Sequence, residues 1–247
     1  MKIAVFGDSF ASHQLDNDSI GKSWVDIVKE HHEVVNFGAS GSCFQYSYEL
    51  FLKEYKNFDS VIFFVTDYNR RYIKEVSDVL PFIGSSHMIN SISGAEHTKE
   101  TIANTNIENK DHYIKIIDNF RFYFDNYRNA EYELHVHDLL VKNIVTLKPN
   151  ALIIPCFPVS IVSFSPKDTM YTIQLAETAS LDVDMSNVFF DYCCLRKCHL
   201  CEDNNIILGN KILYAMSNGI NYLDLDIKDF VTKLDKPTEY YLKKWTK

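Results

Sequence analysis

The sequence lacks the features of secreted, membrane-spanning and nucleic-acid-binding proteins. In its 247 residues no apolar run approaches the ~20 residues of a transmembrane helix, and no signal peptide is visible at the start. The formal net charge is -8, whereas a protein that binds nucleic acid or an anionic membrane needs a basic face. We therefore expect a cytoplasmic protein with no nucleic-acid and no membrane partner.

Cysteine is too sparse for a disulfide scaffold, and free thiols in a reducing compartment are the simpler interpretation. The six cysteines are Cys43, Cys156, Cys193, Cys194, Cys198 and Cys201. The last four surround His199, and Cys198–Cys201 has the C-x2-C spacing of a zinc site. A second such pair is missing, and adjacent cysteines on a strand point in opposite directions. We favour incidental buried thiols, and expect no metal and no cofactor.

What the chain does contain is an alternation of strand and helix patterns. The expected strands are Ile3–Phe6, Val34–Phe37, Ser60–Val65 and Ala151–Pro155. The expected helices include Phe44–Tyr55, two within residues 111–147, and Asn205–Met216, which ends before Gly219. This alternation predicts βαβ units in an α/β fold, a three-layer α/β/α sandwich around a mainly parallel sheet. With no internal repeat or linker, we expect one domain over residues 1–247.

The middle of the chain interrupts this rhythm. Residues 84–109 are polar, and their apolar residues recur with no sustained helical or strand period. Such a segment is typical of a functional loop or lid. We place an insertion at about residues 70–148. Residues 157–185 are ambiguous, and Val188–Phe190 is expected to form a final short strand.

The first strand runs directly into Gly7-Asp8-Ser9. Gly7 permits a sharp turn, and the Asp8 side chain can bond to its own backbone to hold that turn. Open α/β sheets bind their ligands at the carboxyl ends of their strands, where Ser9 is expected. Its hydroxyl can act as a nucleophile if the chain supplies a base and an oxyanion site. A plain turn is the alternative.

Two further polar segments follow the second and third strands. Asn36-Phe37-Gly38-Ala39-Ser40-Gly41-Ser42 leads into a helix, and the Gly41 N–H can stabilise an oxyanion. Thr66-Asp67-Tyr68-Asn69-Arg70 follows the buried strand Ser60–Val65, and the Asn69 side chain can donate to the same oxyanion. An ordinary strand–helix loop and a helix cap are the respective alternatives.

Near the C-terminus, His199 lies just before the last helix. A histidine at a loop-to-helix junction can return to the top of the sheet and accept the proton of Ser9. Glu202, Asp203 and Asn204 then form the start of the helix, where negative charge is favourable.

Together these four segments resemble the SGNH/GDSL hydrolase family, an α/β/α fold of esterases, lipases and carbohydrate deacetylases. The resemblance covers the first 70 residues and roughly residues 186–216. It implies that Ser9 is the nucleophile and first oxyanion donor, that Gly41 is the oxyanion glycine, and that His199 is the base. Asn69 is the candidate third donor, offset by one position from the family's Gly-x-Asn-Asp, and Thr66 is its alternative.

The resemblance breaks at the position three residues before His199, where the family has Asp and this chain has Arg196. Either Asp191 supports His199, or a backbone carbonyl orients the ring and the site works as a Ser–His dyad. We assign substrate binding to Asp8, Thr66 and Arg70, since a guanidinium suits planar anions. An exposed arginine pair at a helix start is the alternative for Arg70.

Two hypotheses of function follow. The first is a serine esterase that cleaves or transfers an acyl group, in particular acetyl, on a carbohydrate or small ester. The second is a related fold, weakly active or inactive, that binds a glycan or a protein partner. The sequence leaves the oligomeric state open.

Overall fold

The part of the chain that the structure describes contains a central sheet of four parallel strands. This computed structural model describes residues 1–12, 22–39, 41–70, 73, 75–76, 92–158, 164, 166–179 and 200–233. The strands are β1 (Lys2–Phe6), β2 (Glu33–Asn36), β3 (Ser60–Val65) and β4 (Leu152–Pro155). They lie in the order β2-β1-β3-β4, and each neighbouring pair is parallel. The four strands predicted within residues 3–155 and the parallel sheet are confirmed.

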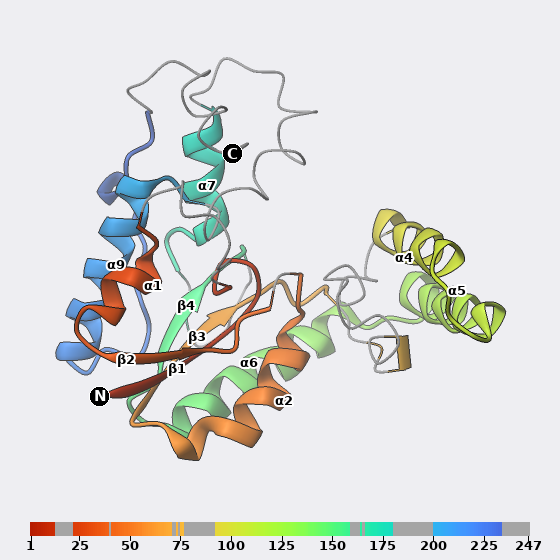
Figure 1. Ribbon diagram of the computed structural model, residues 1–247, viewed down its shortest axis with the longest axis horizontal. Coiled ribbons are helices and arrows are strands. Elements are labelled where there is room, and N and C mark those ends of the chain that lie inside the picture. Colours follow the sequence, from red (N-terminus) through yellow and green to blue (C-terminus); the bar gives the residue numbers. More distant parts are fainter. Residues whose placement is uncertain are drawn as a thin grey trace.

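Helices cover both faces of this sheet. The α-helices of the described residues are α1 (Trp24–Lys29), α2 (Phe44–Glu54), α4 (Ile92–Asn104), α5 (Lys110–Asn126), α6 (Ala130–Leu147), α7 (Met170–Ala179) and α9 (Glu202–Ser217). Short 3-10 helices span Tyr55–Asn57 and Ile227–Asp229. In Figure 1, α1 and α9 lie on one face of the sheet and α2 and α6 on the other. The predicted three-layer α/β/α architecture is therefore confirmed.

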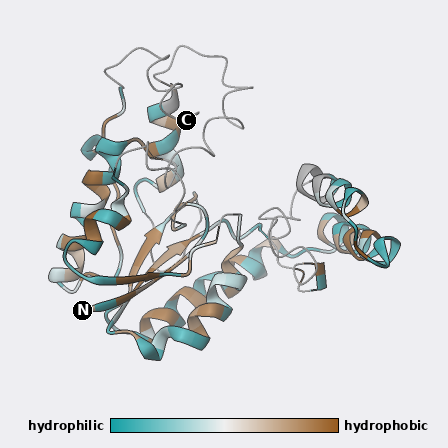
Figure 2. Cartoon of the chain, in the orientation of Figure 1, coloured by the Kyte–Doolittle hydropathy of each residue, from teal (hydrophilic) through white to brown (hydrophobic). Residues whose placement is uncertain are grey.

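The strands bury side chains on both faces, as their continuous apolar sequences predict. Successive residues of a strand point to opposite faces, so each strand supplies two cores. On β3, Ile62 and Phe64 pack in the core beneath α1 and α9, whereas Phe63 and Val65 pack in the core beneath α2 and α6. Figure 2 shows hydrophobic residues (brown) gathered on the strands, whereas hydrophobic and hydrophilic residues (teal) alternate around the helices.

The strand order reverses between β1 and β3. From β1 the chain passes to β2 on one side, and then to β3 on the other side of β1. At such a switch point the loops leave the carboxyl ends of two adjacent strands toward opposite faces, which opens a crevice between them. The turn after β1 contains Ser9, and the loop after β3 contains Thr66–Arg70. The fold thus brings two of the predicted segments to one place.

The prediction of an irregular loop over residues 84–109 is wrong for part of that range, because residues 92–104 form helix α4. This helix projects from the sheet with α5 (Figure 1). It is stabilised by the partner helix rather than by a long apolar stripe. Glu96 pairs with Arg121 at 2.7 Å and Lys99 with Asp118 at 2.9 Å. Ile102 packs in a small core with Ile117 of α5.

The predicted insertion at about 70–148 divides into two parts. Helices α4 and α5 stand away from the sheet, but α6 belongs to the main sandwich, where its Val141 and Ile144 pack beneath the strands. The closing helix predicted at Asn205–Met216 is confirmed as α9. The strand expected at Val188–Phe190 lies outside the described residues, and the single-domain organisation stays a prediction. Among the described helices, none is long and apolar enough to cross a membrane.

Helices α1 and α9 pack closely at Gly209. A Cβ atom there would lie 2.7 Å from Cβ and 2.9 Å from Cγ2 of Ile27. We predict that Gly209→Ala lowers the free energy of unfolding by about 1–2 kcal/mol, because the overpacking cost exceeds the gain in helix propensity. Asn210→Ala, at the exposed neighbouring position, should instead raise it by a few tenths.

Urea unfolding of both variants checks this prediction. Equal or greater stability of Gly209→Ala relative to Asn210→Ala would contradict it.

Candidate active site

The turn after β1 is determined by Gly7. Its φ is +145°, and a Cβ atom at this position would lie 2.5 Å from Cβ of Phe64 on β3, so no other residue fits without strain. The Asp8 carbonyl then accepts a hydrogen bond from the Ser12 N–H at 2.8 Å and closes the turn. Ser9 is partly exposed within this turn, at the carboxyl end of β1.

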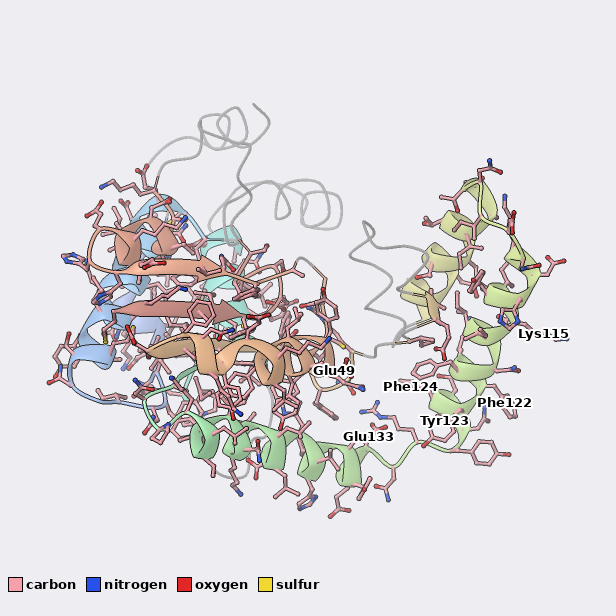
Figure 3. All side chains as sticks on the ribbon, turned by 60° about the horizontal axis from the view of Figure 1, so that its bottom comes forward. Glu49, Lys115, Phe122, Tyr123, Phe124 and Glu133 are labelled. Atoms are coloured by element: carbon pink, nitrogen blue, oxygen red, sulfur yellow. The ribbon has the colours of Figure 1, made fainter. Side chains whose placement is uncertain are left out.

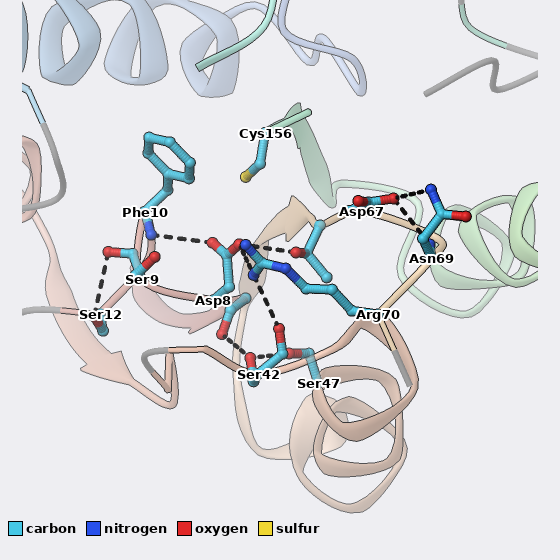
Figure 4. Close-up of polar contacts among 12 residues, drawn as sticks. Asp8, Ser9, Phe10, Ser12, Ser42, Ser47, Asp67, Asn69, Arg70 and Cys156 are labelled. Carbon is cyan, nitrogen blue, oxygen red and sulfur yellow. Dashed lines mark hydrogen bonds and ion pairs between the residues drawn. The ribbon is translucent and has the colours of Figure 1, made fainter. Parts of the chain in front are cut away.

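The carboxylate of Asp8 is fully buried and joins the turn to the loop after β3 (Figure 4). One oxygen accepts from the Phe10 N–H at 3.0 Å. The other accepts from Thr66 Oγ1 and from the guanidinium of Arg70, each at 2.8 Å. The predicted substrate-binding residues Asp8, Thr66 and Arg70 are therefore brought together. Asp8 and Thr66 are buried and bonded within the protein, and the assignment of substrate contacts to the three stays a prediction.

Arg70 extends the network to the end of β4. Its guanidinium lies 4.5 Å from the ring centroid of Phe157, two residues beyond the strand, and donates to the Ser42 carbonyl at 3.4 Å. The Arg70 side chain is 13% exposed, so it is neither an exposed arginine at a helix start nor fully enclosed. A single buried ion pair thus connects the ends of β1, β3 and β4 with the turn after β2.

The segment after β2 packs directly against the Ser9 turn. The Asn36 side chain donates to the Ala11 carbonyl at 2.7 Å, and Ser42 Oγ donates to the Gly7 carbonyl at 3.0 Å. Gly41 lies in this segment with φ +73°. The structure therefore brings together the two turns that sequence reasoning assigned to the nucleophile and the oxyanion glycine. The oxyanion roles of Ser9 and Gly41 stay predictions.

Asn69 points elsewhere. Its backbone N–H and its side-chain amide both donate to Asp67, at 2.8 and 2.9 Å, and its side-chain oxygen accepts from Arg128. Figure 4 draws Asn69 beyond Asp67, on the side away from Ser9. The structure does not bring this amide to the Ser9 turn. The bonds to Asp67 form an Asx turn, in which an aspartate side chain holds the loop that follows it.

The predicted base His199 and its candidate support Asp191 lie outside the described residues. The residues after His199 are described and firmly held. Leu200 is buried in the core beneath α1 and α9. The Cys201 N–H donates to both carboxylate oxygens of Glu177 on α7, each at 3.1 Å. The chain that leaves His199 is therefore anchored where α9 begins.

Sequence reasoning did not assign Cys156 and Phe157 to the candidate site. Both follow the strand that was expected at Ala151–Pro155, so their place at the edge of the sheet that carries Ser9 follows from the parallel fold. Figure 4 draws Cys156 beside the Asp8–Arg70 pair. Burial raises the pKa of the Cys156 thiol well above its ordinary value, and the Asp8 carboxylate raises it further. This thiol is therefore protonated at neutral pH and is a poor nucleophile.

Of the cysteines considered for zinc, the structure describes Cys201. Burial raises the pKa of its thiol strongly, and the carboxylate of Glu177 adds to that effect. Within the described ranges, no group of His, Cys, Asp and Glu side chains is arranged to hold a metal ion. Cys193, Cys194 and Cys198 lie outside those ranges.

A pocket of about 520 Å³ lies between α2 and α6, and Arg70 is one of the residues that line it. Four aromatic rings line it, together with the carboxylates of two glutamates. The rings are those of Phe44, Tyr48, Tyr68 and Tyr132. Figure 3 shows the two carboxylates, Glu49 on α2 and Glu133 near the start of α6. Pockets of this size that combine apolar walls with a few polar groups suit small ligands. Ser9 is not among its lining residues.

Comparisons with known proteins give weak likenesses. The sequence matches no protein-family model and no curated protein. Among solved structures, a variant of an acetyl xylan esterase from Geobacillus stearothermophilus is 15% identical, with a TM-score of 0.34. The match covers 91% of this chain and 96% of that protein.

A second solved structure is that of a G-D-S-L family protein from Desulfitobacterium hafniense. It is 16% identical, with a TM-score of 0.30, and the match covers 87% of this chain and 98% of that one. The fold described above rests on the strand order and on the layers of helices.

The Asp8–Arg70 ion pair gives a prediction on stability. We expect Asp8→Asn to lower the free energy of unfolding by about 3 kcal/mol, because it leaves a guanidinium in a largely buried place without its carboxylate. Arg70→Met should destabilise as well. The double variant should lose about 1–3 kcal/mol less of the free energy of unfolding than the two single variants lose together.

Urea unfolding of the wild type, both single variants and the double variant completes the cycle. Additive effects within about 0.3 kcal/mol would contradict the coupling.

Proposed function

We propose that the chain is a serine esterase of the SGNH/GDSL type, which cleaves or transfers an acyl group on an oxygen. The substrate we propose is an acetyl ester of a carbohydrate, or a small ester. The observation that carries the proposal is the place of Ser9. It is partly exposed in a turn that requires glycine at position 7, at the switch point of a parallel sheet, with a second glycine-containing turn packed against it.

The residues perform this reaction as follows. The Ser9 hydroxyl oxygen attacks the ester carbonyl carbon while His199 accepts the hydroxyl proton. The backbone N–H groups of Ser9 and Gly41 donate to the oxyanion of the tetrahedral intermediate. His199 returns the proton to the leaving alkoxide, which departs and leaves the acyl group on Ser9. Water, or an acceptor hydroxyl, then attacks the acyl carbonyl carbon while His199 accepts its proton. The bond from the acyl carbon to Ser9 Oγ breaks, and His199 returns the proton to Ser9.

Support of His199 is the step in which this chain differs from the family. Arg196 stands where the family has its aspartate, so the carboxylate of Asp191 or a backbone carbonyl orients the imidazole. A third oxyanion donor from Asn69 would require its amide to leave Asp67. Two backbone donors already form an oxyanion hole of the kind that serine proteases use.

The test is hydrolysis of p-nitrophenyl acetate by the wild type and by Ser9→Ala. We expect the wild type to hydrolyse the ester and the variant to lose at least about 10³-fold in kcat, since the nucleophile is removed. Ser12→Ala serves as the matched control, because Ser12 lies in the same turn and its hydroxyl donates to the Ser9 carbonyl. An inactive wild type, or equal rates for wild type and Ser9→Ala, would reject the esterase proposal.

The pocket between α2 and α6 favours a second candidate, a protein that binds a glycan without cleaving it. Aromatic faces with nearby carboxylates suit a neutral sugar, whose C–H faces pack on rings and whose hydroxyls donate to carboxylates. Two tyrosines allow a matched test of this pocket, since Tyr132 and Tyr214 are 67% and 66% exposed but only Tyr132 lines it.

We predict that xylohexaose or chitohexaose binds to the wild type and that Tyr132→Ala weakens this binding about 5-fold or more, a loss of about 1 kcal/mol. Tyr214→Ala, the control on α9, should bind as the wild type does. Calorimetric titration measures both. Absence of binding by the wild type, or equal losses in the two variants, would remove this candidate.

A further inference from the structure

The pocket between α2 and α6 carries a charge that a neutral sugar does not balance. Two carboxylates and one guanidinium line it, those of Glu49, Glu133 and Arg70. The Arg70 guanidinium is paired with the buried carboxylate of Asp8 at 2.8 Å. The carboxylate of Glu133 is paired with Arg128 at 2.6 Å, and both of these side chains are largely buried. Two of the three lining charges are therefore balanced within the protein.

The third lining charge is that of Glu49 on α2 (Figure 3). Among the residues that the structure describes, its carboxylate forms no ion pair. Its contact is with the side-chain amide of Gln45, one turn earlier on the helix, at 3.4 Å, which is long for a hydrogen bond. Glu49 is partly buried, so water screens its charge less than at an open surface. The pocket therefore favours a positively charged ligand.

Aromatic rings on the pocket wall favour the same sign of charge. Phe44 and Tyr48 lie on α2 beside Glu49, and their rings stack with centroids 6.1 Å apart. Tyr68, from the loop after β3, and Tyr132, near the start of α6, add two further rings. The face of an aromatic ring is the negative end of its quadrupole and attracts a cation. The rings and the carboxylate thus act together on a ligand.

The protein already binds one of its own cations in this way. The guanidinium of Arg128 lies 5.3 Å from the ring centroid of Tyr68 and 4.5 Å from that of Phe124. Its Nε–H donates to the carboxylate of Glu133 at 2.6 Å. Tyr68 and Glu133 both line the pocket. One lining ring and one lining carboxylate therefore serve a cation of the chain itself, and Glu49 with the other rings faces the space that a ligand can enter.

We propose that this pocket binds a ligand with a substituted ammonium group, which lies against the rings and has Glu49 as its counter-ion. The inference goes beyond both proposed functions and does not depend on hydrolysis at Ser9. Aromatic walls are the usual means by which proteins recognise quaternary ammonium groups. A metal ion fits less well, because calcium and magnesium require several oxygen ligands. At about 520 Å³, the pocket has room for a molecule larger than the ammonium group itself.

Choline and 3,3-dimethylbutan-1-ol are the matched probes, because they share one shape and differ in a charged nitrogen against a neutral carbon. Each is titrated into the full-length chain and binding is followed by nuclear magnetic resonance. We expect choline to bind at least about 5-fold more tightly than the neutral alcohol. Raising the salt from about 50 to about 500 mM should weaken the binding of choline and leave that of the alcohol unchanged.

Glu49→Gln removes the charge and keeps the shape of the side chain. It should weaken choline binding about 5-fold or more and leave the binding of the neutral alcohol unchanged. Glu54→Gln is the matched control, because Glu54 is a partly buried glutamate on the same helix and is not among the residues that line the pocket. It should bind choline as the wild type does.

Tyr132→Leu tests the contribution of a ring, since leucine keeps an apolar side chain without an aromatic face. It should weaken choline binding about 2-fold or more and change the binding of the neutral alcohol less. Tyr214→Leu, at the equally exposed tyrosine on α9, should have no effect on either probe.

The outcomes separate this proposal from the proposed functions. Absence of choline binding by the wild type, or equal affinity for the two probes, overturns the ammonium site and leaves the esterase to its own test with Ser9→Ala. Equal losses in Glu49→Gln and Glu54→Gln also overturn it, since the effect would then be one of overall charge. Binding of xylohexaose without binding of choline would assign the pocket to a neutral sugar. Should Glu49→Gln fail to fold, the two probes on the wild type and on Tyr132→Leu decide the question.

Discussion

The buried carboxylate of Asp8 is the group on which the geometry of the candidate site depends. It is one anion with three donors, and each donor comes from a different part of the site: the Phe10 N–H from the turn itself, Thr66 from the end of β3, and Arg70 from the loop beyond. Because a buried charge is costly unless it is paired and hydrogen-bonded, these parts must approach together. The turn that carries Ser9 is therefore locked to β3 rather than supported by its own backbone alone.

Much of the fold could be predicted because its signals are local. The run Ser60–Val65 is continuously apolar, as a strand covered on both faces requires, and Gly7-Asp8-Ser9 has the composition of a sharp turn. Once the sheet is parallel, the turns that follow its strands meet at one edge. This is why Asp8, Thr66 and Arg70 could be grouped before their contacts were known.

The parts that could not be predicted depend on contacts between distant residues. Helix α4 has a polar sequence, and its partners for Glu96 and Lys99 lie on α5. Asp8 and Arg70 are 62 residues apart. Asn69 illustrates the reverse case, since its place after β3 suggested an oxyanion donor, but its side-chain amide donates to Asp67, two residues away. Local pattern identifies which groups are present, and tertiary contacts decide what each one bonds.

The small core between α4 and α5 has a consequence for how the protein responds to stress. Its buried members, Ile73, Val76, Ile102 and Ile117, form a cluster separate from the two cores that cover the sheet. Cooperative unfolding follows shared buried surface, so a cluster with its own apolar contacts opens with its own free energy. We expect helices α4 and α5 to open at a lower free energy than the strands of the sheet. Proteolysis or amide hydrogen exchange would detect this opening.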